Sequence, residues 1–302
     1  MTLWRVAVPG SSANLGAGFD TLALALELFL DVTAGPRWGE ARAFVSGAHV
    51  AGLPSDDSNL VWRAFCRAFR SRGKEPPDYT LQLHNEIPLE SGLGSSAAAA
   101  VAGIALANAI GELELSAEER IALAAEFEGG HPDNVAASTL GGLAVVARRA
   151  DGRIAAVSLP WPAEIGVLLA VPELRLATEK ARAVLPSSYS RADAVSNIQR
   201  AALFVAAVGS GKFSLLRTAV EDRIHQPYRA PLVPGLQEAL ALDAPGLLGV
   251  ALSGAGPSLV AFVSDPLPTR AALEAIYERL GIPCRVQSLA VAQPGVRYFE
   301  TG

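Results

Sequence analysis

The stretch from Pro88 to Ala98, Pro-Leu-Glu-Ser-Gly-Leu-Gly-Ser-Ser-Ala-Ala, most constrains how this chain can fold. Residues 79–84 before it alternate polar and apolar side chains, which predicts a strand, and the mostly apolar residues 97–108 predict a helix. A glycine-rich loop between a strand and a helix is suited to anions, because the free N–H groups and the dipole of the helix point at it. Ser95 and Ser96 add hydroxyls for a phosphate oxygen or a metal ion. A serine-capped turn without a ligand is the alternative interpretation.

Composition excludes several classes of protein. The 302 residues carry a formal net charge of −5, and the longest basic run is Arg148-Arg149, so we expect no nucleic-acid partner. Half of the residues are apolar, which is enough for a substantial core. The two cysteines, Cys66 and Cys284, lie far apart without a metal-binding spacing, which favours a reducing compartment and no zinc site. No signal segment begins the chain, and the apolar run 97–110 is shorter than the roughly 18 residues that span a bilayer, so we expect a cytoplasmic protein without a membrane partner.

Mixed strand and helix patterns without strict alternation predict an α+β fold. The expected strands are 4–9, 42–46, 79–84, 143–147, 154–159, 165–171, 249–252, 259–263 and 284–291. The expected helices are 59–69 with Asp57 or Ser58 as its cap, 97–108, 116–127, a small-residue helix ending at Gly141, 178–183, 192–208, 213–220 and 269–280. Periodicity does not settle the type of residues 22–32. Pro160-Trp-Pro162 predicts a boundary between domains 1–160 and 161–302.

Two glycine patterns resemble nucleotide motifs but lack their context. Gly92-Leu-Gly94 fits a loose dinucleotide fingerprint, yet a helix follows where a second strand ending in an acidic residue is required. Gly209-Ser-Gly-Lys212 resembles the end of a P-loop, but Phe213 follows the lysine and Ala206 stands at the first glycine position. We interpret this second pattern as a turn between two helices.

Three glycine- and serine-rich loops remain, at residues 10–20, 88–98 and 253–258. With them the chain resembles the GHMP kinase family, whose three motifs occur here in the same order and span nearly the whole chain. This resemblance implies a two-domain α+β fold, with an N-terminal domain like the ribosomal protein S5 domain 2 and a C-terminal ferredoxin-like domain. It also implies an active site between the two domains, with ATP and Mg²⁺, and a homodimer.

Four further stretches resemble the members of the family that phosphorylate L-homoserine. They are residues 130–135, 178–186, 193–200 and 222–235. The resemblance implies transfer of a phosphoryl group from ATP to the hydroxyl of L-homoserine, giving O-phospho-L-homoserine in threonine biosynthesis. The alternatives are another small-alcohol kinase, for example of the mevalonate or shikimate type, and a catalytically silent ligand-binding paralogue. The complete phosphate loop speaks against the silent paralogue.

The resemblance assigns the second loop to the phosphates of ATP. The expected ATP-binding residues are Pro88, Leu89, Glu90, Ser91, Gly92, Leu93, Gly94, Ser95, Ser96, Ala97 and Ala98, with Asn59 proposed near the adenine. The expected Mg²⁺ ligands are Ser96 and Glu126, both hard oxygen donors. Glu128 is an alternative carboxylate ligand. In that interpretation Glu126 is a solvated helix residue without a role in the site.

A zwitterionic acceptor needs an anion for its ammonium and cations for its carboxylate. Asp20 with Asn14 is expected at the ammonium, and Arg200 with Arg229 at the carboxylate, because a guanidinium binds a carboxylate with two hydrogen bonds. A helix-surface charge for Arg200 and a local salt bridge for Arg229 are the alternatives. Ser253 and Gly254 of the third loop complete the expected substrate site.

His131 and Asn134 are expected near the substrate hydroxyl and are, with Arg200, the candidate catalytic residues. Several members of the family have an aspartate, a proposed base, at the position of Asn134. An amide cannot accept a proton at neutral pH. We therefore expect no side-chain base at this position, with Asn134 orienting the hydroxyl while positioning and charge neutralisation supply most of the acceleration. His131 is the competing base.

Overall fold

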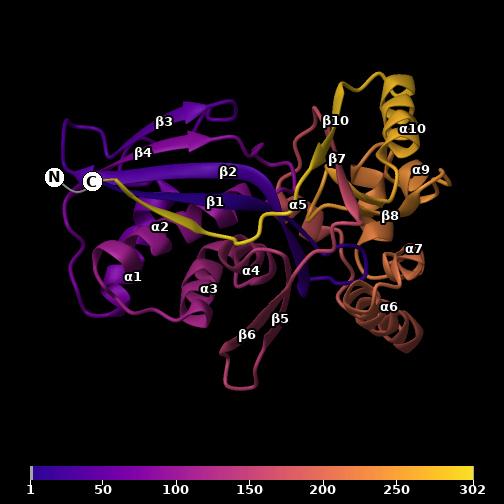
Figure 1. The fold of residues 1–302 in the computed structure, drawn as a ribbon, viewed down its shortest axis with the longest axis horizontal. Helices are drawn as coiled ribbons and strands as arrows, with labels where there is room; N and C mark the ends of the chain where they lie inside the picture. Colours follow the sequence, from indigo (N-terminus) through magenta and orange to yellow (C-terminus); the bar gives the residue numbers. More distant parts are fainter. Residues whose placement is uncertain (1–2, 302) are drawn as a thin grey trace.

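The computed structural model describes residues 3–301, which form two sheets lying side by side (Figure 1). The first sheet has the order β11-β1-β2-β4-β3, with β5 paired to β2 and β6 paired to β5. All of its pairs are antiparallel except β3 with β4. Its strands are β1 (Leu3–Ala13), β2 (Leu22–Pro36), β3 (Ala43–Gly47), β4 (Tyr79–Asn85), β5 (Leu143–Arg148), β6 (Ile154–Leu159) and β11 (Arg297–Thr301).

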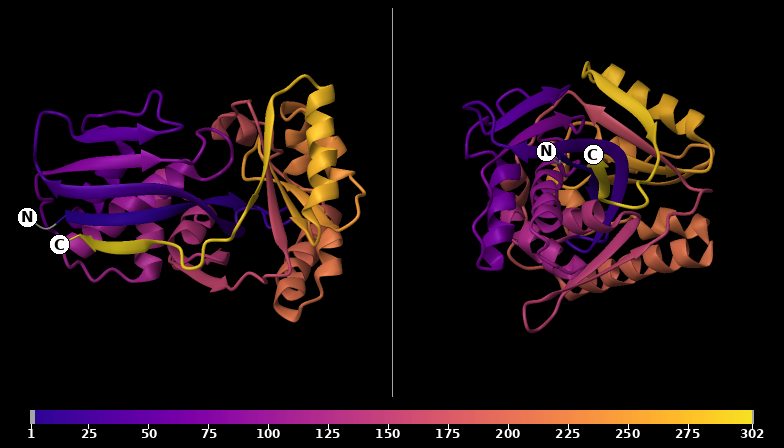
Figure 2. Two further views of the ribbon diagram at one scale, coloured as in Figure 1. Left: turned by 45° about the horizontal axis from the view of Figure 1, so that its top comes forward. Right: turned by 60° about the vertical axis from the view of Figure 1, so that its left-hand side comes forward.

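Four helices cover one face of the first sheet (Figures 1 and 2). They are α1 (Leu60–Ser71), α2 (Ser95–Ile110), α3 (Ala117–Ala125) and α4 (Asp133–Leu140). The central helix α2 contacts β1, β2 and the other three helices, which is why its residues are apolar all round. Ser116 caps α3 with Glu119 in a capping box. The expected cap of α1 is wrong: Asn59 caps it, because its side chain accepts from Val61 N.

The second sheet is antiparallel, in the order β10-β7-β9-β8. Side chains of its strand β7 alternate between two hydrophobic cores. Leu168 and Ala170 belong to a core with α9 and α10. Val167 and Leu169 belong to the larger core of the first sheet. The strands are β7 (Gly166–Pro172), β8 (Leu247–Leu252), β9 (Leu259–Val263) and β10 (Cys284–Leu289). The helices are α5 (Thr178–Ala183), α6 (Arg191–Ser210), α7 (Leu216–Ala219), α8 (Gln226–Arg229), α9 (Leu236–Leu240) and α10 (Pro266–Arg279).

The expected α+β fold is confirmed, and most expected elements end within a few residues of the observed ones. Residues 22–32 belong to the long strand β2. Residues 213–220 do not form the expected continuous helix, because a 3₁₀ turn at Phe213–Leu215 precedes the single turn α7. The stretch 209–212 that resembles a P-loop is only partly the expected turn: Gly209 and Ser210 are the last residues of α6, and Gly211 ends the helix in the left-handed conformation.

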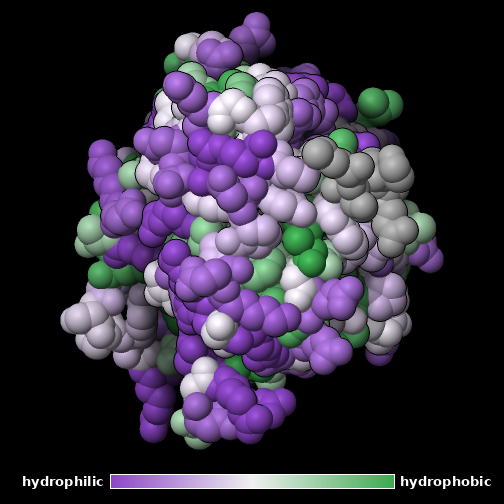
Figure 3. Space-filling model, turned by 90° about the vertical axis from the view of Figure 1, so that its left-hand side faces the viewer, coloured by the Kyte–Doolittle hydropathy of each residue, from purple (hydrophilic) through white to green (hydrophobic). Residues whose placement is uncertain are grey.

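The division at residues 160 and 161 stays a prediction. The larger core continues across it, because Trp161, Phe204 and Phe262 pack with residues of the first sheet. The last strand, β11, returns along β1, so that both termini lie at the same end of the molecule (Figures 1 and 2). The face at that end is mostly hydrophilic, with hydrophobic side chains gathered near its centre (Figure 3). Within residues 3–301, no helix is both long and apolar enough to span a membrane.

Candidate active site

The three glycine- and serine-rich loops, which lie far apart in the sequence, meet in the structure. Ser11 N donates to Leu93 O at 3.0 Å, which joins the first loop to the second. Gly254 N donates to Ala13 O at 3.0 Å, which joins the third loop to the first. Ser258 N donates to Ser91 O at 3.1 Å and closes the set. Backbone hydrogen bonds therefore hold the three loops as one unit between the two sheets.

Glycine in the second loop serves this packing. Gly94 precedes α2 with φ +68°, in the left-handed region that favours glycine. A Cβ on Gly94 would lie 2.4 Å from Ser11 Oγ of the first loop and 3.1 Å from Asn134 Oδ1. Glycine at this position thus allows a close approach of protein groups to each other.

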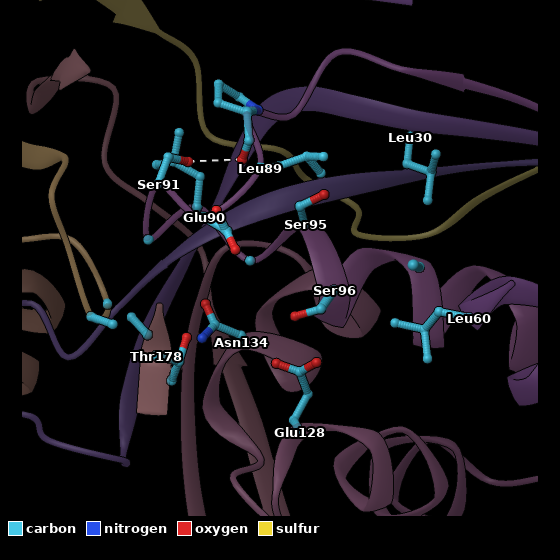
Figure 4. A pocket seen from close by; sticks show the side chains of 18 of the residues that line it. Leu30, Leu60, Leu89, Glu90, Ser91, Ser95, Ser96, Glu128, Asn134 and Thr178 are labelled. Carbon is cyan, nitrogen blue, oxygen red and sulfur yellow. Dashed lines mark hydrogen bonds between the residues drawn. The ribbon is translucent and has the colours of Figure 1, made fainter. Parts of the chain in front are cut away.

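A cavity of about 530 Å³ opens beside these loops, which is a typical size for a small-molecule site. Residues 88–96 line its middle, with Ser95 and Ser96 at the start of α2 (Figure 4). One end is apolar and includes Leu30, Leu53 and Leu60. The other end is charged, and its ionisable residues are Asp20, His131, Asp133, Arg182 and Arg229.

Not every residue expected at the nucleotide reaches the cavity with its side chain. Ala97 and Ala98 are fully buried behind the loop and do not line the cavity. Asn59 lines it, but its amide is engaged, donating to Pro54 O and accepting from Val61 N. Whether Asn59 contacts adenine stays a prediction.

The structure separates the two candidate metal-binding glutamates. Glu126 lies outside the cavity, where Arg67 donates to both of its carboxylate oxygens at 2.8 Å. Glu128 lines the cavity, and its side chain points toward Ser96 (Figure 4). Burial raises the pKa of Glu128 to about 7, although a hydrogen bond with Ser96 opposes the rise. The placement of Glu126 in the site is therefore corrected, because Glu128 and not Glu126 lines the cavity, and metal binding by Glu128 stays a prediction.

Asp20 is the anion at the charged end of the cavity. Arg182 Nη2 donates to Asp20 Oδ1 at 2.9 Å, and His131 Nδ1 lies 3.2 Å from Asp20 Oδ2. Burial alone would raise the pKa of Asp20, but the hydrogen bonds with His131 and Arg182 lower it to about 2. Asn14 accepts from Asp20 N at 3.1 Å and donates to Gly254 O at 2.9 Å, so its amide fixes the first loop to the third. Its contact with an ammonium stays a prediction.

The expected pair Arg200 and Arg229 is not brought together at the cavity. Arg229 is 1% exposed and lines the cavity. Arg200 is not among the lining residues, and its guanidinium donates to Glu221 Oε2 and Ser196 Oγ. Arg182 stands in the site instead, from α5. The placement of Arg200 in the site is therefore corrected.

Asn134 links the first loop to the cavity. Its Oδ1 accepts from Ser11 Oγ at 2.9 Å, and its side chain lies between Thr178 and Ser96 (Figure 4). Its neighbour Asp133 accepts from Asn134 N at 2.8 Å and is 4% exposed. Burial, and then the charge of Asp20, raises the pKa of Asp133 to about 6.

The third loop contributes less side-chain chemistry than expected. Ser253 Oγ is within hydrogen-bond distance of Ser12 Oγ and donates to Gly92 O at 2.8 Å, and Ser253 does not line the cavity. Gly254 does line it. Sequence reasoning missed Thr178, Arg175 and Arg182, although two of them lie in the stretch 178–186 that we singled out without assigning roles.

Comparison with known proteins agrees with this arrangement. Residues 59–142 match the family model of the GHMP kinases N terminal domain, and residues 202–285 match the GHMP kinases C terminal model. A homoserine kinase of Synechococcus sp. is 40% identical over 97% of this chain and 97% of its own length. The chain belongs to the GHMP kinase family. The expected family and the expected two-domain fold are confirmed.

Other relatives of this GHMP kinase agree with that result. A homoserine kinase of Solibacter usitatus is 47% identical over 86% of the chain and 84% of its own length. The crystal structure of homoserine kinase from Cytophaga hutchinsonii superposes with a TM-score of 0.86 at 29% identity, covering 98% of this chain and 97% of the other. Galactokinase of Lactococcus lactis, at 15% identity and a TM-score of 0.69, shares the fold.

Proposed function

We propose that this GHMP kinase transfers the γ-phosphoryl group of ATP to the hydroxyl of L-homoserine, giving ADP and O-phospho-L-homoserine, a step of threonine biosynthesis. One observation carries the proposal: a single cavity holds the phosphate loop in its middle and both an anion and two guanidinium groups at one end. The anion is Asp20, and the guanidinium groups belong to Arg182 and Arg229. This charge pattern is complementary to an amino acid. The homoserine kinases among its relatives support the same acceptor.

The rest of the cavity suits a nucleotide. The N-terminus of α2 and residues 90–96 supply N–H donors for phosphates. The apolar end, with Leu30, Leu53 and Leu60, suits a flat base. The order of the three regions, apolar end, phosphate loop and charged end, supports a binding mode in which the terminal phosphate of ATP lies next to the acceptor.

The donor set near Ser96 fits Mg²⁺. The Ser96 hydroxyl, at the start of α2, and the Glu128 carboxylate are hard oxygen donors that line the cavity. One or two protein ligands are usual when phosphates supply the others. Within residues 3–301, no cluster of three or more His, Cys, Asp and Glu residues forms an all-protein metal cage. Bound there, Mg²⁺ would neutralise phosphate charge.

Two cations and one anion are arranged for a zwitterionic acceptor. Arg182 uses Nη1 and Nη2 on Asp20, and its buried Nε has no partner within the described residues. Asp20 stays ionised far below neutral pH, because its pKa is about 2. It can therefore hold an ammonium at any physiological pH, with Arg182 and Arg229 meeting the carboxylate.

We propose that no side chain acts as the base. Asn134 hydrogen-bonds Ser11 through Oδ1, which leaves its Nδ2 group for the acceptor oxygen. The amide orients the hydroxyl, and the proton leaves to a phosphate oxygen or to solvent. His131 is the group that could replace this route, because it lines the cavity and its Nδ1 lies 3.2 Å from Asp20 Oδ2.

An ADP-release assay with L-homoserine, mevalonate, shikimate and galactose tests the function. We expect the highest kcat/KM for L-homoserine. Its deaminated analogue 4-hydroxybutyrate is the sharper comparison, because it lacks only the ammonium that Asp20 is proposed to hold. Equal kcat/KM for L-homoserine and 4-hydroxybutyrate would contradict the proposal, and inactivity with every acceptor would favour a silent paralogue.

We further propose a cytoplasmic homodimer. Cys66 and Cys284 are both unpaired, which suits a reducing compartment. The long helix α6 exposes Val195 and Ile198 at 45% and 68%, apolar side chains three residues apart on one face. Sedimentation equilibrium of the protein and of Ile198→Glu measures the association, and a monomeric wild-type protein would contradict the dimer.

A further inference from the structure

His225 is fully buried next to the charged end of the cavity, although it does not line the cavity. Its Nε2 lies 2.8 Å from Gly16 O of the first loop, and its Nδ1 lies 3.2 Å from Arg229 Nη1. Phe19 stacks on the imidazole with the ring centroids 5.3 Å apart. The ring is thus held on a face and at both nitrogens.

These two contacts define the tautomer of His225. A guanidinium can only donate, so Nδ1 must accept from Arg229. A carbonyl oxygen can only accept, so Nε2 must carry the proton that is donated to Gly16. Burial lowers the pKa of His225, and so does the charge of Arg229, while Asp222 opposes the shift. The imidazole is therefore neutral with its proton on Nε2.

The protein uses only part of the Arg229 guanidinium. Nε donates to Ala181 O at 3.1 Å, and Nη1 donates to Gly254 O at 3.0 Å and to His225. Within residues 3–301, no group accepts from Nη2 and no carboxylate forms an ion pair with Arg229. Burial, and then the charge of Arg182, lowers the pKa of Arg229 to about 10, which leaves it charged at neutral pH. A buried cation without a counter-ion, lining a cavity, is suited to an anionic group of a ligand.

We propose that His225 is a positioning residue for the carboxylate of the acceptor. By accepting from Nη1 it fixes the rotation of the guanidinium, so that the two free N–H groups of Nη2 are directed to the cavity. The inference rests on the proposed function, because it requires an acceptor with a carboxylate. A purely structural His225 would instead act only through Gly16, by holding the first loop.

Two amide substitutions separate the two contacts. His225→Gln places an amide nitrogen near the position of Nε2 and keeps a donor for Gly16, but removes the acceptor for Arg229. His225→Asn places an amide oxygen near the position of Nδ1 and keeps the acceptor for Arg229, but removes the donor for Gly16. Each variant is assayed with L-homoserine and with 3-aminopropan-1-ol, which lacks only the carboxylate.

We expect His225→Gln to raise the KM for L-homoserine about 10-fold or more, because the carboxylate loses an oriented charged donor. The KM for ATP and the kcat/KM for 3-aminopropan-1-ol should change less than about 3-fold, and His225→Asn should change every constant less than about 3-fold. Equal losses with both acceptors, or a larger loss in His225→Asn, would overturn the proposal in favour of the structural role. Wild-type protein that does not use L-homoserine would overturn the proposed function and, with it, the carboxylate as the target.

A measurement on the unaltered protein covers the case in which a variant does not fold. The chain has four histidines, so the ¹⁵N chemical shifts of the imidazole nitrogens can be resolved and assigned. We expect His225 to be neutral at pH 7 with its proton on Nε2. A proton on Nδ1, or a doubly protonated ring, would remove the hydrogen bond from Arg229 and overturn the inference.

Discussion

The backbone oxygen of Ser253 lies 2.2 Å from the point where a Cβ on Gly92 would stand. Backbone of the second loop therefore touches backbone of the third, and neither can give way by rotating a side chain. Because β8 and β9 flank the third loop, the shape of the phosphate loop depends on the second sheet as well as on the first.

Gly92→Ala should damage both stability and activity. The substitution adds a steric clash to the backbone strain of φ +80°. We therefore expect the free energy of unfolding to fall by at least about 2 kcal/mol more than in a control variant that has the backbone strain alone. Gly152→Ala is that control, with φ +82° and no atom within 4 Å of its Cβ. Urea unfolding of both variants, with the KM for ATP, measures the difference. Equal losses in the two variants would contradict the packing of the two loops.

Glu128→Gln and Glu126→Gln test the metal ligand. We expect Glu128→Gln to lower kcat/KM by roughly 100-fold and to raise the Mg²⁺ concentration needed for half-maximal rate, because a direct ligand is lost. Glu126→Gln loses only a half-exposed ion pair with Arg67, so its kcat/KM should stay within about 3-fold of the wild type. Mg²⁺ titrations of initial rate compare the two variants. An Mg²⁺ requirement changed only by Glu126→Gln would reverse the assignment.

Arg182→Met and Arg200→Met test the acceptor site. Arg182 binds Asp20 inside the cavity, so its loss should lower kcat/KM for L-homoserine about 10- to 100-fold with the KM for ATP unchanged. Arg200 binds Glu221 outside the cavity, so its loss should cost at most about 1 kcal/mol of stability and leave the kinetics unchanged. Steady-state kinetics with each substrate varied in turn measure both effects. A change in the KM for L-homoserine in Arg200→Met would return that residue to the site.

Asp133→Asn should change how stability depends on pH. The folded-state pKa of Asp133 is about 6, above its usual 3.8, so the unfolded chain binds fewer protons between these values. This carboxyl therefore favours the folded state below about pH 4, and that contribution is lost as pH rises through 6, by roughly 3 kcal/mol. Asp133→Asn removes the titration and keeps an acceptor for Asn134 N. Urea unfolding at pH 5 and pH 7.5 measures the free energy of unfolding of both proteins. We expect the stability of the variant relative to the wild type to be greater at pH 7.5 than at pH 5. The same difference at both pH values would contradict the raised pKa of Asp133.

The pH dependence of kcat tests the absence of a side-chain base. We expect log kcat to show no acidic limb that depends on His131, because Asn134 cannot take the proton and the proposed route uses no side chain as a base. His131→Ala and the wild type should give profiles of the same shape. The matched control is His84→Ala, because His84 lies on β4 and its Nδ1 is within hydrogen-bond distance of Ser46 Oγ. An acidic limb that disappears in His131→Ala alone would establish His131 as the base.

Sequence patterns predicted the elements and the three loops well, because strand alternation, helix caps and glycine positions are local signals. Helix α2, which follows the phosphate loop, begins two residues before its expected start. The observed ranges of α5 (Thr178–Ala183) and β9 (Leu259–Val263) match the expected ones. Local sequence signals could not decide whether Glu126 or Glu128 faces the cavity. Helix α3 ends at Ala125 and a 3₁₀ turn follows, so the side chain that faces the cavity depends on where the helix changes type.

Side-chain contacts between residues far apart in the chain could not be predicted from local sequence signals either. Arg200 shares a helix face with Asn197, and that face does turn inward, since Asn197 is 3% exposed. Asn197, however, binds Asp222, and the longer side chain of Arg200 reaches Glu221. Arg182 meets Asp20 across 162 residues of chain, and the short helix α5 has no pattern that distinguishes Arg182 from Lys180.

The pairing of β11 with β1 has a consequence for the order in which the protein is made. Trp4 pairs with Ala34 on one side and with Glu300 on the other, so the second edge of β1 stays uncovered until residues 297–301 have been made. Until then the growing chain presents an open strand edge, which is where a nascent chain can pair with another. The first sheet is therefore closed only after every strand of the second sheet has been made.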